Sequence, residues 1–371
     1  MTIYKLGELF CGPGGIAKGI DSAVEAVRAD GGDVSVEHTW ANDYDRDTCA
    51  TYKANIPSAK VIHKDIRKLD IKKELSSIDG LAFGFPCNDF SVVGEQKGMD
   101  GTFGPLYEYG ARVIDQYSPL WFVAENVGGL RNSNEGRAFE TILSRMQSAG
   151  ARKYGGYTLY PHLYKFENYG VPQNRHRILI VGIRNDCGTE FKVPSPEPYR
   201  NIDNSVGRAL SNIPPNATNQ ELTKQSADVI RRLENILPGQ NAFTADLPPE
   251  LRLNIGGAKI SQIYRRLEAD KPSYTITGSG GGGTHVYHWS EPRALTNRER
   301  ARIQTFPDDF EFVGGKESVR KQIGMAVPVD GAAVVFTALF RSLAHINYPT
   351  IEPNLCHLLP DRRPKRLAVG A

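Results

Sequence analysis

The sequence predicts an α/β fold: a doubly wound, mostly parallel sheet with a smaller, irregular domain inserted into it. Up to about residue 183, short apolar runs alternate with segments whose apolar residues recur at helical spacing. This alternation is typical of a parallel sheet covered by helices on both faces. From 185 to about 290 this alternation of strand-like and helical segments stops. Many Pro, Asn, Ser and Gly residues there indicate loops. A chain of 371 residues is long enough for two domains.

The elements follow in chain order. A strand over 3–10 ends at the glycine turn 11–15, and a helix begins there whose apolar residues recur from Ile16 to Val27. We expect further strands over 34–40, 61–62, 80–84, 120–124 and 177–182, and further helices over 46–55, 106–117, 138–149, 296–305 and 332–345.

The early segment lacks a closing helix, which the apolar turns of 317–345 supply. We therefore expect 1–185 and 291–345 to form one domain, 186–290 to form the inserted domain, and 346–371 to be a short, basic tail.

Composition excludes several classes of protein. With 40% hydrophobic and 23% charged residues, the chain is neither disordered nor fibrous. The mean hydropathy is −0.39 and no apolar run reaches the ~20 residues of a membrane span. Five scattered cysteines without a Cys-x-x-Cys pair, and histidines without metal-ligand spacing, predict no metal site and a reducing cytoplasm. A net charge of +3 decides neither for nor against a nucleic-acid partner.

The glycine turn indicates a nucleotide-like ligand. Its spacing differs from the Gly-x-Gly-x-x-Gly dinucleotide pattern, because Ala17 stands where the third glycine belongs. Asp43 ends the second strand, where a carboxylate suits paired ribose hydroxyls, and Tyr44 beside it suits an adenine face. Asp65 follows the third strand and could accept the adenine amino group. A turn or helix-cap role for both carboxylates stays open.

A cysteine, a carboxylate and two arginines are expected to converge on the carboxyl edge of the sheet. Cys87 follows a buried strand and is preceded by a rigid proline, although a small core cysteine is the alternative. Glu125 ends the next apolar strand, where burial would raise its pKa and let it hold a proton. Arg175 and Arg177 alternate with His176, so both should face the same side.

Taken together, these motifs resemble the DNA (cytosine-5) methyltransferase family, whose fold is that of S-adenosylmethionine-dependent methyltransferases. The matching stretches, in family order, are Glu8-Leu9-Phe10-Cys11-Gly12-Pro13-Gly14-Gly15, Asn42-Asp43-Tyr44, Asp65-Ile66, Gly84-Phe85-Pro86-Cys87-Asn88-Asp89-Phe90-Ser91, Glu125-Asn126-Val127, Gln173-Asn174-Arg175-His176-Arg177, Arg293-Ala294-Leu295-Thr296-Asn297-Arg298-Glu299 with Gln304-Thr305-Phe306-Pro307, and Gly324-Met325-Ala326-Val327-Pro328. One departure is Met325, where the family usually has asparagine. The change either removes one polar contact or leaves the backbone to make it.

The resemblance implies an enzyme that transfers a methyl group from S-adenosylmethionine to carbon 5 of a flipped-out cytosine in duplex DNA. Cys87 would be the nucleophile at carbon 6, Glu125 would neutralise nitrogen 3, Arg177 would hold oxygen 2, and Arg175 would steady the nucleophile loop or a phosphate. The cofactor would contact Phe10, Gly12, Pro13, Gly14, Gly15, Asp43, Tyr44, Asp65, Ile66, Pro86, Leu106, Ala326 and Val327.

The resemblance also makes 186–290 the target-recognition domain of a cytoplasmic monomer, without a membrane partner. A cognate restriction endonuclease or another defence component could accompany it. The glycine-rich stretch 278–284 either lets backbone approach DNA or serves as a hinge. Three rivals are an RNA methyltransferase on the same fold, a catalytically silent DNA-binding regulator and an NAD oxidoreductase. The long insert argues against the first, intact Cys87, Glu125 and Arg177 against the second, and the glycine spacing against the third.

Overall fold

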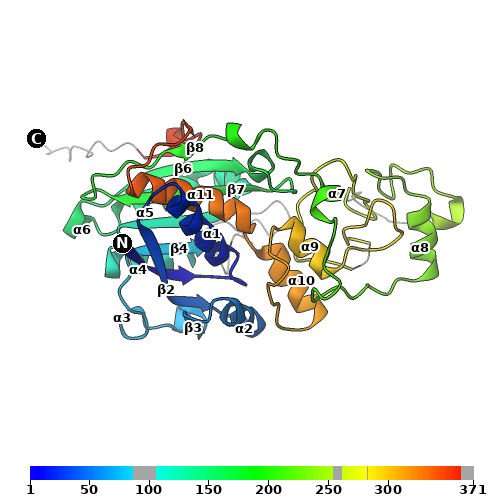
Figure 1. The fold of residues 1–371 in the computed structure, drawn as a ribbon, viewed down its shortest axis with the longest axis horizontal. Coiled ribbons are helices and arrows are strands. Elements are labelled where there is room, and N and C mark those ends of the chain that lie inside the picture. Colours follow the sequence, from blue (N-terminus) through cyan, green and yellow to red (C-terminus); the bar gives the residue numbers. More distant parts are fainter. Residues whose placement is uncertain (87–105, 254–260, 282, 361–371) are drawn as a thin grey trace, which may run out of the picture.

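A seven-stranded sheet forms the centre of one half of the molecule (Figure 1). The computed structural model describes residues 1–86, 106–253, 261–281 and 283–360. The sheet has the order β3-β2-β1-β4-β5-β7-β6, and its strands are β1 (Thr2–Leu9), β2 (Val34–Asp43), β3 (Lys60–His63), β4 (Gly80–Gly84), β5 (Trp121–Val127), β6 (Tyr157–Lys165) and β7 (His176–Arg184). The first five strands pair in parallel, whereas β7 is antiparallel to both of its neighbours. The predicted doubly wound, mostly parallel sheet is therefore confirmed.

Helices cover both faces of this sheet and create two apolar cores. One core contains side chains of α1 and α11, and the other contains side chains of α4 and α5. Helix α1 approaches α11 so closely that a Cβ on Gly19 would lie 2.5 Å from the Cβ of Ala332. The helices are α1 (Gly15–Ala29), α2 (Arg46–Asn55), α3 (Ile71–Glu74), α4 (Tyr107–Tyr117), α5 (Arg137–Ser148), α6 (Ala151–Tyr154), α7 (Val206–Ala209), α8 (Ala227–Glu234), α9 (Asn297–Ile303), α10 (Lys316–Met325) and α11 (Val329–Leu343).

A second, loop-rich lobe carries α7 and α8, and α9 and α10 lie between it and the sheet (Figure 1). Apolar side chains of α9 and α10 share one core with Val206, Leu267, Ile276 and Val286 of the insert. The glycine-rich stretch packs on α10, since a Cβ on Gly324 would lie 2.1 Å from the Gly278 nitrogen. The division of the chain at 185 and 291 stays a prediction, and these contacts show that α9 and α10 are built into both parts.

Several elements differ from the expectation. Strand β6, helix α8 and the short antiparallel pair β8 (Val193–Pro194) and β9 (Thr350–Ile351) were not predicted. The stretch Lys316–Leu343 is apolar and long enough for a membrane span, but 83% of its most apolar window is buried inside the protein. It consists of α10 and α11, which are core helices.

Candidate functional site

The glycine turn after β1 leaves open space in front of its backbone. Phe10 and Gly12 both have positive φ angles, of 52° and 58°. A Cβ on Gly12 would meet no atom within 4 Å, so a ligand can approach the main chain there. The Gly12 N–H donates to Oδ2 of Asp43 at 3.1 Å. This bond fixes the turn against the end of β2, and Pro13 stands within the turn.

The same turn contacts the last of the predicted motifs. A Cβ on Gly15 would lie 2.5 Å from the carbonyl oxygen of Val327 and 3.6 Å from the Cβ of Ala326. Gly14, with φ 103°, lies over the ring of Tyr52. The structure therefore brings Gly14, Gly15, Ala326 and Val327 together, although the two motifs stand near opposite ends of the sequence.

Asp43 lies at the end of β2, beside the glycine turn. Its carboxylate is buried and accepts the backbone N–H groups of Gly12 and Asp45. Burial raises the pKa of Asp43, and these two hydrogen bonds oppose the rise. The neighbouring ring of Tyr44 is 60% exposed, with the Lys321 ammonium 5.8 Å from its centre. A carboxylate beside an open aromatic ring fits a ribose with an attached base.

Asp65 is engaged within the protein itself. It caps a short helical turn and pairs with Arg67 at 2.6 Å, and hydrogen bonds from the Arg67 side chain lower the pKa of Asp65 to about 2. Asp65 is therefore a helix cap, which is the role that the sequence analysis left open beside ligand binding. Ile66 beside it is buried in the apolar core.

Glu8 is a buried carboxylate that the sequence reasoning did not single out. The Tyr52 hydroxyl donates to its Oε1, and burial raises the pKa of Glu8 to about 7. Because the Tyr52 ring also supports Gly14, this pair lies directly beneath the glycine turn. Glu8 begins the first motif, so its place in the sequence could have singled it out as a candidate site residue.

Glu125 and Arg177 form an ion pair at the carboxyl edge of β5. Arg177 Nε lies 2.8 Å from Glu125 Oε1, and the two side chains are only 12% and 14% exposed. Residues Val127 and Arg177 also border a cavity of about 360 Å³. This edge therefore offers a carboxylate and a guanidinium side by side, next to space for a ligand.

The predicted nucleophile, Cys87, lies outside the described residues. The segment that leads to it is anchored, because the Asn126 side-chain amide donates to the Phe85 carbonyl at 3.1 Å. Pro86 and Leu106 stand on either side of the undescribed stretch, and Leu106 is buried. Asn126 is thus a positioning group that follows Glu125 directly in the sequence.

Arg175 differs from the expectation. It is 1% exposed, and its guanidinium donates to the carbonyls of Ile276 at 2.9 Å, Gly324 at 3.0 Å and Ala326 at 2.8 Å. A side chain so deeply buried cannot contact a DNA phosphate, so that part of the expectation is wrong. Arg175 instead joins the start of β7 to the insert and to the last motif.

Two glutamines extend this buried network. Gln173 donates to Gln304 on the α9 end at 2.9 Å and accepts the Ile276 N–H at 2.8 Å. Gln304 in turn donates to the carbonyls of Ile323 and Ala326. Both glutamines belong to predicted motifs, but the sequence did not indicate that they meet.

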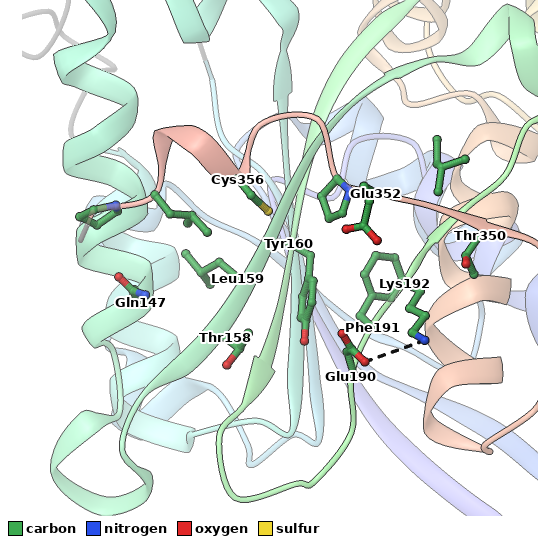
Figure 2. A pocket seen from close by; sticks show the side chains of 14 residues that line it. Gln147, Thr158, Leu159, Tyr160, Glu190, Phe191, Lys192, Thr350, Glu352 and Cys356 are labelled. Carbon is green, nitrogen blue, oxygen red and sulfur yellow. Dashed lines mark ion pairs between the residues drawn. The ribbon is translucent and has the colours of Figure 1, made fainter. Parts of the chain in front are cut away.

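A larger cavity, of about 660 Å³, lies along strand β6 (Figure 2). Its lining includes Tyr160, Phe191 and Cys356, and a Glu190–Lys192 ion pair of 4.0 Å borders it. None of the predicted site residues lines it. Size alone therefore gives it no catalytic role.

Comparison with known proteins agrees with the geometry. Residues 4–341 match the family described as C-5 cytosine-specific DNA methylase. The chain is 55% identical over 358 residues to the Type II methyltransferase M.BbvI of Brevibacillus brevis, covering 94% of each protein. It is 40% identical over 355 residues to M.NgoFVII of Neisseria gonorrhoeae, covering 94% of this chain and 89% of that relative.

A putative DNA modification methyltransferase encoded within an Escherichia coli prophage has a similar fold, with a TM-score of 0.69 at 21% identity over 91% of this chain and 99% of that one. The predicted family and fold are thus confirmed. The chain belongs to the C-5 cytosine-specific DNA methylase family and is a DNA (cytosine-5) methyltransferase, related to the Type II methyltransferases of restriction–modification systems.

Proposed function

We propose that this chain methylates carbon 5 of a cytosine flipped out of a specific duplex DNA sequence, through a covalent adduct on Cys87. The Glu125–Arg177 pair carries the proposal, because it lies at the end of β5, next to the strand that leads to Pro86 and Cys87. A base must leave the stack before such buried groups can reach it, at a cost of a few kcal/mol.

The cofactor we propose is S-adenosylmethionine, which supplies an electrophilic methyl group when bound. Asp43 would accept the ribose hydroxyls, and Phe10 and Tyr44 would contact the adenine. The open space at Gly12 supports this assignment, as does the contact of Gly15 with Val327. Asp65 would have to share its carboxylate with Arg67 to reach an adenine amino group.

Cys87 and Glu125 would divide the chemistry on the cytosine ring. The Cys87 thiolate adds to carbon 6, and Glu125 neutralises the charge that develops at nitrogen 3. Arg177, which already holds Glu125, would bind oxygen 2. After carbon 5 has gained the methyl group, it loses its proton to a base and Cys87 leaves as a thiolate, so the ring regains its double bond.

We further infer that residues 186–290, braced by α9 and α10, recognise the DNA sequence, and that the enzyme acts as a monomer in the cytoplasm. The names of its relatives place them among Type II methyltransferases. By this relationship, a cognate restriction endonuclease or another defence component would accompany the protein.

A duplex with 5-fluorocytosine at the target position tests the proposal, since fluorine at carbon 5 cannot leave as a proton does. Bisulfite sequencing of DNA from cells that express the protein first identifies the target. We expect a covalent protein–DNA adduct that Cys87→Ser abolishes and the matched control Cys356→Ser preserves. An adduct that persists in Cys87→Ser would refute the assignment.

A further inference from the structure

The cavity of about 360 Å³ that Arg177 borders lies where the sheet meets the insert. The turn after β5 contributes Arg131 to its lining, the start of β7 contributes Asn174 and His176, and the insert contributes Thr275. Its volume is at the lower end of the ~300–1,000 Å³ that ligand sites usually have. The cavity therefore connects the edge that carries Arg177 with the part of the chain that we expect to read DNA.

The side chains around this cavity suit an anion. Arg131 and Asn174 are exposed, and no carboxylate of the described residues forms an ion pair with Arg131. Among the same residues, no carboxylate lines the cavity. Glu167 lies 2.6 Å from His176 Nε2, but it is 15% exposed and lies outside the lining. A guanidinium and an amide that both face solvent can donate to an anion with several acceptor oxygens.

Main-chain hydrogen bonds hold the walls of the cavity together. Thr275 Oγ1 donates to the Asn174 carbonyl at 2.7 Å, and the Asn174 N–H donates to the Ser273 carbonyl at 2.7 Å. On the β7 side, Arg177 Nη1 donates to the His176 carbonyl at 2.8 Å. The insert is thus fixed to the start of β7 without using the Asn174 side-chain amide, which stays available to a ligand.

A flipped cytosine would bring its backbone to this cavity. Flipping turns a nucleotide out of the stack but leaves its sugar and both flanking phosphates attached. Arg177 contacts Glu125 and also borders the cavity, so a base held by this pair has its backbone close to the cavity.

We propose that the cavity binds one of the two phosphates that flank the flipped cytosine, with Arg131 supplying the charge and Asn174 a hydrogen bond. The proposal rests on the base flipping proposed above. A phosphodiester carries one negative charge, and a guanidinium can bind two of its oxygens at once. Contacts to phosphate position the DNA without reading its sequence. This contact would therefore hold the nucleotide in its extruded position, whatever the target sequence is.

A duplex with one neutral phosphate tests the contact with the full-length chain. A methylphosphonate, in which a methyl group replaces the charged oxygen, is placed at either phosphate beside the target cytosine found by bisulfite sequencing. At one of these two positions, wild-type binding should weaken by about 10- to 100-fold. Arg131→Gln should bind the unmodified duplex with a similar loss, and its plot of log affinity against log salt concentration should be shallower by about 0.9. The methylphosphonate should weaken Arg131→Gln no further, because the two changes remove the same contact.

Two further variants sharpen the test. Asn174→Asp keeps the shape of the side chain and adds a negative charge, so it should weaken binding to the unmodified duplex, and the methylphosphonate should reverse part of that loss. Arg341→Gln is the matched control, because it removes the same charge from α11, where Arg341 pairs with Asp30. The methylphosphonate should weaken this control as much as it weakens wild type.

Three results would overturn the proposal. If the effects of Arg131→Gln and of the methylphosphonate add independently at both positions, Arg131 binds neither phosphate. A changed methylated sequence with an unchanged salt slope would make Arg131 a base-reading residue instead. Wild type that methylates no cytosine would refute the proposed function and this site with it, whereas wild type that methylates its target while the effects add would overturn the phosphate site alone.

Discussion

Replacing Arg175 by methionine should destabilise the fold rather than alter the chemistry directly. The Arg175 guanidinium donates to three buried backbone carbonyls, those of Ile276, Gly324 and Ala326. In Arg175→Met, the Ala326 carbonyl would keep the Gln304 side chain as a donor at 3.3 Å. The carbonyls of Ile276 and Gly324 would lose the donor that Arg175 provides.

The size of the effect follows from these two carbonyls. A buried acceptor left without a donor costs about 1–3 kcal/mol, so the free energy of unfolding should fall by about 2–6 kcal/mol. An unfolding entropy of about 2.1 cal/mol/K per residue gives about 0.8 kcal/mol/K for 371 residues. A loss of about 4 kcal/mol then lowers the melting temperature by about 5 °C.

Calorimetric melting of wild type, Arg175→Met and Arg177→Gln would measure this difference. Arg177 pairs with Glu125 at the carboxyl edge of β5, where the proposed chemistry takes place, so Arg177→Gln should abolish methylation with a smaller change in melting temperature. If Arg175→Met melts like wild type but no longer methylates DNA, Arg175 acts on the nucleophile loop, and its bracing role is wrong.

Two further predictions concern the cofactor side of the site. Asp43→Ala should raise the dissociation constant for S-adenosylmethionine by about 10- to 100-fold, because a charged hydrogen-bond acceptor is lost; an unchanged value in a calorimetric titration would make Asp43 purely structural. The raised pKa of Glu8, about 7 against 4.5 in an unfolded chain, means that the folded state holds this proton more tightly. Its stabilising contribution is therefore complete below pH 4.5 and is lost as the pH rises through about 7, by about 3 kcal/mol. Urea unfolding across this range should show the decline in wild type and a flatter profile in Glu8→Gln, whereas equal profiles would mean that another group titrates.

The sequence predicted the parts of the fold whose signals are local. Strands β4 and β5 are continuous apolar runs, and both were expected within a few residues of their observed bounds. Strand β6 was not expected, because Pro161 and His162 interrupt its apolar pattern. Proline is tolerated there because β6 is an edge strand, a fact that only the tertiary pairing reveals.

In the candidate site, too, the sequence predicted local features but not the tertiary contacts. The sequence predicted that Arg175, Arg177 and Glu125 converge on one edge of the sheet, and Arg177 Nε lies 2.8 Å from Glu125 Oε1. Alternation could not indicate that Arg175 lies where segments about 100 and 150 residues later in the chain pass. Its hydrogen-bond partners are carbonyls, which every residue type carries, so no sequence pattern marks them.

Met325, which replaces the usual asparagine of the family, can also be explained by contacts that the main chain makes. The Met325 side chain is 63% exposed, so it takes no part in the buried network. The contacts of this motif are made by backbone groups on either side of it: Arg175 binds the carbonyls of Gly324 and Ala326, and the Val327 carbonyl lies against Gly15. Any residue at 325 leaves these carbonyls in place, provided that α10 still ends there. The motif therefore joins the glycine turn, the start of β7 and α9 through its main chain, and the loss of the usual asparagine leaves that junction intact.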